Sequence, residues 1–320
     1  MRLIFAAYAF SRQYELLTIL KHMLESYLAI KDNITRFQKD LDLLHEVDGS
    51  MLLDSGAFSA WTKGKTVDID GFAKFCLTLQ DHPAVQGIAN LDVIPGAYGK
   101  IPDSDEVERS AKKGWENYQY LLSRGVRKDK LIHIYHQGEH ETWLDLLVEE
   151  GGPYIGISPA NDRKTDQKIM WLDRIMPKLI DNQGYPKKKF HGFAATALKL
   201  LQRYPWFSTD STSWLRPGAY GKVLLPRIKD GEVLYNVEPT WVPFSDKSPT
   251  QKENGKHFNT LTQLEQETIR QFLEEAGTTP EILATDHIAR QVVNIVTWQR
   301  IVEKLPEWPW PFKTRRTSFF

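Results

Sequence analysis

Residues 86–137, QGIANLDVIPGAYGKIPDSDEVERSAKKGWENYQYLLSRGVRKDKLIHIYHQ, contain one full repeat of the pattern that decides the fold. The apolar run QGIANLD (86–92) has the length and composition of a buried strand, and LIHIYHQ (131–137) is a second. Between them an amphipathic helix is predicted from Asp103 to Gly125, with apolar positions at Val107, Ala111, Trp115, Tyr118 and Leu122. This order predicts two parallel strands joined by a crossover helix.

The same alternation continues in both directions, from the first residue to about residue 230. The other apolar runs are RLIFAA, SMLLD, PYIGIS, KFHGF and WFSTD, with KVLLPR (222–227) as a weaker eighth strand because Pro226 interrupts it. Two further amphipathic helices are predicted, after Gln13 (Leu16, Ile19, Leu20, Met23, Leu24) and after Thr165 (Ile169, Leu172, Met176, Leu179). The number and length of these units predict an α/β fold of the TIM (β/α)8 barrel type. A doubly wound open sheet is the alternative, but its glycine-rich phosphate turn is missing after the first strand.

The pattern changes beyond residue 240. A polar loop, SDKSPTQKENGKH, leads to a predicted helix at about 262–276, and a second helix opens with Thr279 and Pro280 in N-cap and first-turn positions. We therefore predict a catalytic domain over residues 1–240 and a helical C-terminal appendage over residues 241–320.

Composition is that of a globular protein, with 41% hydrophobic and 26% charged residues. No apolar run reaches the roughly 18 residues needed to span a bilayer, and the start MRLIFAAYAFSRQYE lacks a secretion signal, so a cytoplasmic protein without membrane contact is expected. The only cysteine, Cys76, lies in an apolar helical run, which predicts a core residue and excludes an internal disulfide or a zinc site built from cysteines.

Charge gives no global attraction to nucleic acid, because 41 basic residues balance 41 acidic ones. Nucleic-acid binding would need local basic patches, for which the candidates include Arg216, Lys222, Arg315 and Arg316. A solvated surface is the alternative interpretation of each patch.

Polar residues recur where the apolar runs end, and in a TIM barrel those ends carry the active site. They are Asp54, Asp92, His136, Gln137, Ser158 and Asp210. Three carboxylates at one rim are costly unless they share charge, bind a metal or handle substrate protons. Taken singly, Asp54 and Asp210 also suit turn or helix caps. A metal site is disfavoured, because His133 and His136 lie three apart on a strand and face opposite sides.

These same residues resemble the motifs of the guanine transglycosylases, the enzymes that install queuosine and archaeosine precursors in tRNA. The corresponding segments run in the family's order through residues 50–215: LDSGAFSAW, ANLDVIPG, YHQGE, YIGIS and FSTDSTSW. The family's Cys-rich zinc site is absent, so no zinc subdomain is expected. The segment HGFAATALKLLQRYPWFSTDSTSW is closer to the DNA-modifying branch, often encoded by phages and genomic islands, which inserts a 7-deazaguanine such as preQ0.

The resemblance implies a pentosyltransferase that needs no cofactor and no metal and exchanges guanine in DNA for a 7-deazaguanine. It implies that Asp210 is the nucleophile and Asp54 the general acid/base. The base would be held by Asp92 on its N1–H and exocyclic amine, by Gln137 and the Gly156 backbone on its carbonyl, and by stacking on Phe58, in a site completed by Ser55 and Gly138. Phe58 as an ordinary core residue is the alternative.

Three other functions remain open from the sequence. The same chemistry on tRNA is the nearest; a non-catalytic nucleic-acid-binding subunit and a metal-assisted hydrolase using Asp54, Asp92 and His136 are the others. A helper protein or a homodimer fits any of them, and a phage-encoded enzyme would act in the host cytoplasm.

Overall fold

Nine short parallel strands form the main sheet of the computed structural model, which describes residues 1–6, 19–96, 99–229, 231–247 and 256–313. The strands follow one another around the sheet in the order β5-β4-β3-β2-β1-β9-β8-β7-β6. Their bounds are β1 Arg2–Ala6, β2 His22–Ser26, β3 Ser50–Asp54, β4 Val85–Ala89, β5 Leu131–Ile132, β6 Ile134–His136, β7 Tyr154–Ser158, β8 Lys189–Gly192 and β9 Ser208–Ser211.

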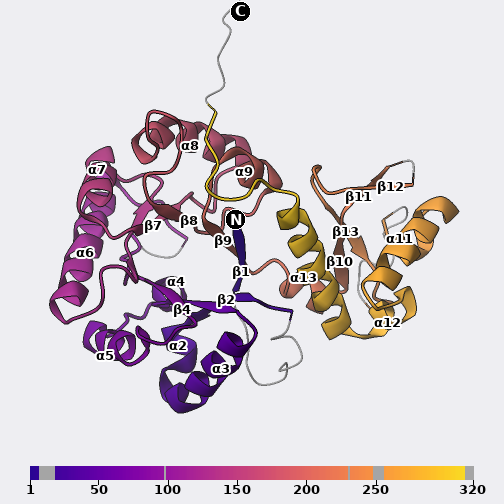
Figure 1. Cartoon of the computed structure of the whole chain (residues 1–320), viewed down its shortest axis with the longest axis horizontal. Coiled ribbons are helices and arrows are strands. Elements are labelled where there is room, and N and C mark those ends of the chain that lie inside the picture. The colour runs from indigo at the N-terminus through magenta and orange to yellow at the C-terminus, as the bar shows by residue number, and fades with distance from the viewer. Residues whose placement is uncertain (7–18, 97–98, 230, 248–255, 314–320) are drawn as a thin grey trace, which may run out of the picture.

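The two edge strands of this sheet are neighbours in the chain, separated only by His133. β5 pairs with β4, β6 pairs with β7, and the N–H of Gly156 donates to the carbonyl oxygen of His133 at 2.8 Å. The sheet therefore curls into a nearly closed barrel (Figure 1). The predicted α/β class is confirmed, whereas the regular eightfold (β/α)8 pattern is not. A doubly wound order is also ruled out, because the strands wind in one direction throughout.

Helices surround the strands, as Figure 1 shows. α6 illustrates how the sequence sets their limits. Asp103 and Glu106 form a capping box at its start, and Gly125, with a φ of 96°, follows its end. The helices around the sheet are α2 Tyr27–Ile30, η1 Lys31–Asn33, α3 Ile34–Glu46, α4 Ala57–Trp61, α5 Ile69–Leu79, α6 Ser104–Ser123, α7 Glu141–Glu150, α8 Thr165–Leu179 and α9 Leu198–Arg203.

Two predicted elements of the barrel were wrong. KVLLPR is not a barrel strand, because its residues 222–225 form β10, which pairs antiparallel with β13 in a separate two-stranded sheet. Met23 and Leu24, assigned to a helix after Gln13, lie instead in β2, where Met23 packs outward and Leu24 contacts the barrel interior. Leu16 of that predicted helix falls outside the described residues.

The appendage is mixed rather than helical, and it begins before residue 241. Its first sheet joins residues on both sides of the predicted boundary, because β10 pairs with β13. Figure 1 shows these strands and helices beside the barrel. The elements are α10 Arg216–Ala219, β10 Lys222–Leu225, β11 Arg227–Lys229, β12 Glu232–Leu234, β13 Thr240–Pro243, η3 Phe258–Thr260, α11 Gln263–Glu275, α12 Pro280–Thr285 and α13 His287–Glu303.

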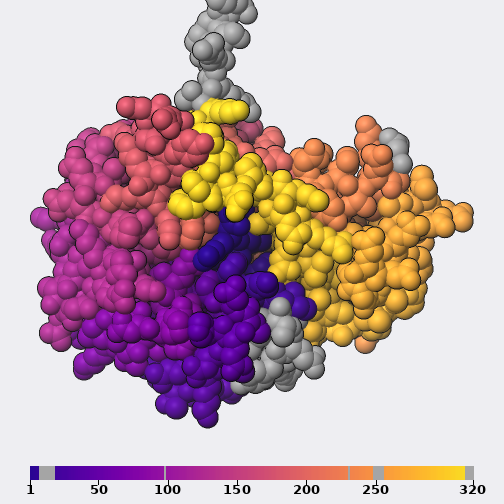
Figure 2. Space-filling view, in the orientation of Figure 1, coloured from indigo at the N-terminus to yellow at the C-terminus, as the bar shows by residue number. Residues whose placement is uncertain are grey.

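Inside the barrel, a small group of buried side chains packs into one apolar layer, formed by Ile4, Leu52, Ile132, Tyr154 and Phe207. Trp308 packs edge-on against Phe207, with ring centroids 5.0 Å apart, so the C-terminal segment covers this layer on the amino-terminal side. Figure 2 shows that segment crossing the barrel next to the N-terminal strand. The opposite side, at the carboxyl ends of the strands, is left for the site described next.

Cys76 is fully buried in α5, which confirms the prediction of a core residue. Within the described ranges, no helix has the length and apolar character to cross a membrane.

Candidate active site

Asp54, Asp92 and Asp210 line one cavity of about 400 Å³ at the carboxyl ends of the barrel strands. Asp54 ends β3 and lies two residues beyond the inward-facing Leu52, so the strand's two-residue period keeps it on the inner face. Asp210 in β9 follows the buried Ser208 in the same way. The structure therefore brings the three predicted acids together, in a volume typical of small-ligand sites, about 300–1,000 Å³.

A larger hollow, of about 980 Å³, lies between α8, α9 and the C-terminal segment. Its charged side chains are exposed or paired with one another, as in the 2.7 Å contact between Arg203 and Asp173. A site for chemistry needs polar groups that converge and have altered proton affinity. The smaller cavity meets that condition, so it is the candidate site.

Asp54 is held at the start of a tight turn. Its Oδ2 accepts a hydrogen bond from the N–H of Gly56 at 2.8 Å, so the turn-capping interpretation is correct as well. Gly56 has a φ of 80°, and a Cβ there would lie 2.6 Å from the hydroxyl of Ser26, which makes glycine necessary. Burial raises the pKa of Asp54 to about 6, against the Gly56 hydrogen bond and with help from the charges of Asp92 and Asp210.

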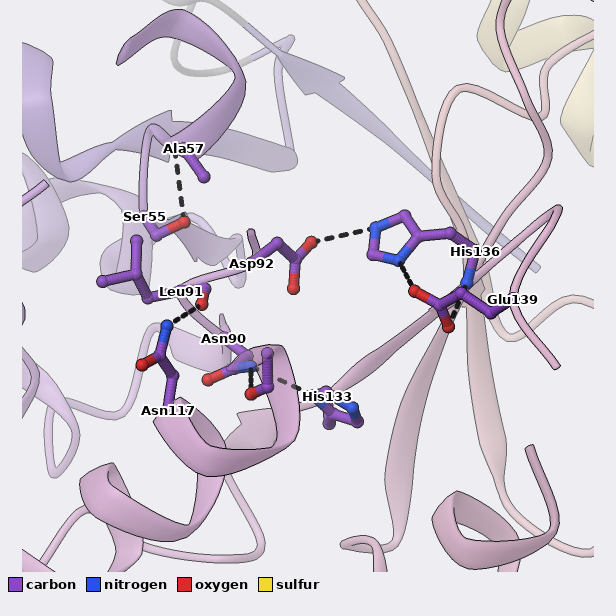
Figure 3. Close-up of polar contacts among 10 residues, drawn as sticks. Ser55, Ala57, Asn90, Leu91, Asp92, Asn117, His133, His136 and Glu139 are labelled. Atoms are coloured by element: carbon purple, nitrogen blue, oxygen red, sulfur yellow. Dashed lines mark hydrogen bonds and ion pairs between the residues drawn. The ribbon is translucent and has the colours of Figure 1, made fainter. Parts of the chain in front are cut away.

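Asp92 belongs to a charged network that Figure 3 shows. Its Oδ2 lies 3.1 Å from Nε2 of His136, and Nδ1 of that imidazole lies 2.8 Å from Oε1 of Glu139. Burial alone would lower the pKa of His136, but the charges of Glu139 and Asp92 on either side raise it well above its usual value. We therefore treat His136 as an imidazolium clamped between two carboxylates.

The second oxygen of Asp92, Oδ1, is buried and has no hydrogen-bond partner among the described residues. The loop that presents it is fixed from behind by α6, where Asn117 donates to the carbonyl oxygen of Leu91 at 2.9 Å and Asn90 donates to that of Gly114 at 2.9 Å (Figure 3). A buried carboxylate oxygen without a hydrogen-bond donor is energetically costly. It is therefore suited to accept a hydrogen bond from a ligand.

Asp210 is held through a single oxygen. Its Oδ1 lies 3.2 Å from Nε2 of His191 and accepts from the N–H of Ala194 at 2.9 Å. No described residue makes a hydrogen bond to Oδ2 of Asp210. Because Asp210 lines the cavity with its side chain only 14% exposed, Oδ2 is the oxygen left for a ligand.

His133 and His136 face different sides, as predicted. His133 is buried against α6, where Nδ1 lies 3.0 Å from Nδ2 of Asn90, and burial lowers its pKa to about 3. Among the described residues, no group of three or more His, Cys, Asp or Glu side chains has the arrangement of a metal site.

Gln137 lines the cavity, and its side-chain oxygen accepts from the N–H of Ala160 at 3.0 Å, whereas no described residue accepts a hydrogen bond from its amide N–H groups. The prediction for the Gly156 backbone was wrong, because its N–H is already donated to His133 within the sheet. Gly156 has a packing role instead: a Cβ there would lie 2.7 Å from Ile134. Gly138 is not among the cavity-lining residues and serves a turn with a φ of 118°.

Phe58 is 55% exposed at the cavity, so it is not an ordinary core residue. It lies on α4, which Trp61 fixes by donating from its indole N–H to the carbonyl oxygen of Gly96 at 2.8 Å. Ser55 also lines the cavity but is buried, and its hydroxyl accepts from the N–H of Ala57 at 3.4 Å.

The predicted nucleic-acid contacts are not brought to this site. Arg216 begins α10 and Lys222 begins β10, and neither lines the cavity. Arg315 and Arg316 fall outside the described residues.

Two residues that hold the site's acids in place, Glu139 and His191, had no role assigned to them from the sequence. Glu139 follows the strand LIHIYHQ by two residues, and His191 appeared only within the predicted strand KFHGF. The one signal for His191 was a titratable side chain at the centre of a short apolar run.

Comparison with known proteins identified no matching family model and no matching curated protein.

Proposed function

We propose that this protein exchanges guanine in DNA for a 7-deazaguanine through a covalent glycosyl ester on Asp210. The observation that carries the proposal is the convergence of Asp54, Asp92 and Asp210 on one cavity, where no described residue makes a hydrogen bond to Oδ1 of Asp92 and the hydrogen bonds of Asp210 to described residues all use its Oδ1. The nearly closed sheet would then act as a variant of the TIM barrel, with the chemistry at the carboxyl ends of its strands.

In the first half of the reaction, a lone pair on Oδ2 of Asp210 forms a bond to C1′ of the sugar. The bond between C1′ and N9 of guanine breaks, and its electron pair leaves with the base. Asp54 supplies the proton that the departing base takes up. Its pKa of about 6 allows it to hold a proton near neutral pH and also to give it up, as a general acid/base requires.

The second half reverses these steps with the new base. The incoming 7-deazaguanine gives its N9 proton to the Asp54 carboxylate, and N9 forms the new bond to C1′. The bond from C1′ to Oδ2 of Asp210 breaks, and the electron pair returns to the carboxylate. A nucleophile that leaves and returns in this way is shared with retaining glycosidases.

Recognition of the base is assigned to Asp92 and Gln137. With Oδ2 of Asp92 paired to His136, Oδ1 accepts from the donor edge of guanine, which consists of N1–H and the exocyclic amine. The amide N–H of Gln137 donates to the ring carbonyl. Adenine lacks this donor edge, so it would leave the buried oxygen of Asp92 unpaired.

Release of labelled guanine and its reincorporation should be measured with duplex DNA and with tRNA in parallel. We expect exchange on DNA that Asp210→Asn abolishes and that Asp166→Asn, at an exposed position of α8, leaves intact. Exchange on tRNA alone would show that the substrate is RNA rather than DNA. Full exchange by Asp210→Asn would refute it.

A further inference from the structure

A line of hydrogen-bonded side chains runs from the barrel interior to Asp210. The hydroxyl oxygen of Tyr154 lies 2.5 Å from Oγ of Ser208, and that Oγ lies 2.6 Å from Nδ1 of His191. Nε2 of His191 then lies 3.2 Å from Oδ1 of Asp210. Neighbouring strands β7, β8 and β9 supply the four residues, and His191 and Ser208 have no exposed surface.

Tyr154, at the inner end of this line, determines in which direction the hydrogen bonds are donated. If Tyr154 donates to Ser208 and Ser208 donates to Nδ1 of His191, then Nε2 carries the hydrogen and donates to Asp210. In the reverse direction the Tyr154 O–H has no acceptor within the described part of the chain, and a buried hydroxyl without an acceptor is unfavourable. Burial also raises the pKa of Tyr154, which keeps its proton available for donation.

A second donor meets the same oxygen of Asp210. The N–H of Ala194 reaches Oδ1 at 2.9 Å, and Ala194 has a φ of 49°, a conformation that residues other than glycine rarely adopt. Strained backbone of this kind persists only where the surrounding structure enforces it, and often at functional sites. Two donors therefore meet Oδ1 of Asp210, which leaves Oδ2 as the oxygen without a hydrogen bond to a described residue.

We propose that His191 is a positioning residue, a neutral imidazole whose tautomer is set by Tyr154 and Ser208 and whose Nε2–H holds Oδ1 of Asp210. This inference rests on the proposed role of Asp210 in base exchange. In the ester, Oδ1 is the carbonyl oxygen and keeps both donors. When the bond to C1′ breaks, the negative charge returning to the carboxylate is shared by Oδ1, where the N–H groups of His191 and Ala194 stabilise it.

The tautomer can be read directly in the free, full-length protein. Long-range ¹H–¹⁵N spectra of ¹⁵N-histidine-labelled protein report which ring nitrogen carries hydrogen, and the His191→Gln variant assigns the signal. We expect a neutral ring with hydrogen on Nε2 at pH 7, and a partial shift to the other tautomer in Tyr154→Phe. Hydrogen on Nδ1, or an imidazolium, in the unaltered protein would overturn the inference.

Kinetic measurements test whether the direction of hydrogen-bond donation along this line affects the reactivity of Asp210. Tyr154→Phe removes one oxygen remote from the substrate, and we expect the rate of ester formation to fall about tenfold with KM unchanged. His191→Leu should lower that rate by about 10²–10³-fold, the usual loss for one donor to a reacting oxygen. His191→Gln, which retains an N–H, should recover part of it. An unchanged rate in Tyr154→Phe whose tautomer has shifted would contradict a positioning role.

The two proposals fail separately. The tautomer is measured without substrate, so absence of guanine exchange together with the expected tautomer would count against the proposed function alone. Exchange at the full rate in His191→Leu would count against the role of His191 while leaving base exchange established.

Discussion

Asp54 combines two demands that one carboxylate rarely meets, because it caps a turn and also lines a cavity beside two other acids. The turn hydrogen bond favours the charged form, whereas burial and the charges of Asp92 and Asp210 favour the protonated form. The second group of effects prevails and raises the pKa to about 6. A residue in this state is suited to proton transfer at the expense of stability.

The stability cost of Asp54 should depend on pH in a defined way. Its folded-state pKa is raised from 3.8 to about 6, so the carboxyl group ionises more readily in the unfolded chain than in the folded one. The resulting penalty on the fold grows between about pH 4 and pH 6, is fully present above pH 6, and disappears well below pH 3.8, where the group is protonated in both states. We expect Asp54→Asn to increase the free energy of unfolding by about 1–3 kcal/mol at pH 7.5 and by only about 0.5 kcal/mol at pH 4.

Urea unfolding at the two pH values measures this difference. Asp162→Asn, at an exposed position after β7, is the control and should change stability by less than about 0.5 kcal/mol. An Asp54→Asn protein that is equally or less stable at pH 7.5 would show that the carboxylate carries no such penalty.

The sequence identified Asp54, Asp92 and Asp210 because each follows an apolar run, and parallel strands bring such positions to one edge. It did not assign roles to His191 or Glu139. The partners of His191 are Ser208 and Tyr154, which lie on other strands, so its function depends on strand register. The prediction that the Gly156 backbone binds the base was wrong for a similar reason. Only the strand pairing shows that its N–H already donates to the carbonyl oxygen of His133.

At the level of elements, α4 is a short helix that carries the exposed ring of Phe58 at the cavity. Phe58 is exposed at the cavity and packs beside Trp61, with ring centroids 5.8 Å apart. A base taken out of a duplex loses its own stacking, which costs a few kcal/mol, and an aromatic side chain compensates for part of it. Under the proposed function, the exposed ring of Phe58 is the surface on which such a base would stack.

Replacing Phe58 should separate binding from stability. We expect Phe58→Ala to weaken the apparent affinity for the nucleic-acid substrate by about 5–150-fold, equivalent to about 1–3 kcal/mol of lost stacking. Its free energy of unfolding should change by less than about 0.5 kcal/mol. Phe72→Ala, in the core of α5, should instead lose about 3–5 kcal/mol of stability. Unchanged substrate affinity in Phe58→Ala would rule out stacking on this ring.

The errors in element prediction have distinct physical causes. In β2, HMLES is too short and too mixed in polarity to stand apart from the preceding apolar residues, so helical periodicity was extended through it. In β10, KVLLPR does form a strand, but its partner β13 lies outside the barrel. Periodicity identifies a strand without showing which strand it pairs with.

For the whole molecule, α13 is the element that joins the appendage to the barrel. Asn294 is fully buried on it, accepting from the N–H of Leu224 in β10 at 2.6 Å and donating to the carbonyl oxygen of Trp214 at 2.9 Å. Gln299, also on α13, reaches the carbonyl oxygen of Ile19, before β2. α13 thus provides hydrogen-bond partners for backbone groups of both the barrel and the appendage.

Loss of this connection should destabilise the entire chain. Asn294→Ala leaves two buried backbone groups unpaired, and we expect the free energy of unfolding to fall by about 2–4 kcal/mol in one cooperative transition. Glu303→Ala, at an exposed position of α13, is the control. Denaturant unfolding followed by far-UV circular dichroism and by tryptophan fluorescence measures this. Two separate transitions in the unaltered protein would show that barrel and appendage are independent.

The proposed covalent ester on Asp210 can be sought directly. The protein is incubated with guanine-containing duplex DNA and denatured, and any nucleic-acid adduct is mapped by peptide mass spectrometry. We expect an adduct on the peptide that contains Asp210, absent in Asp210→Asn, retained in Asp166→Asn and chased away by added 7-deazaguanine. Base exchange accompanied by an adduct on a different residue, or undiminished in Asp210→Asn, would contradict the mechanism.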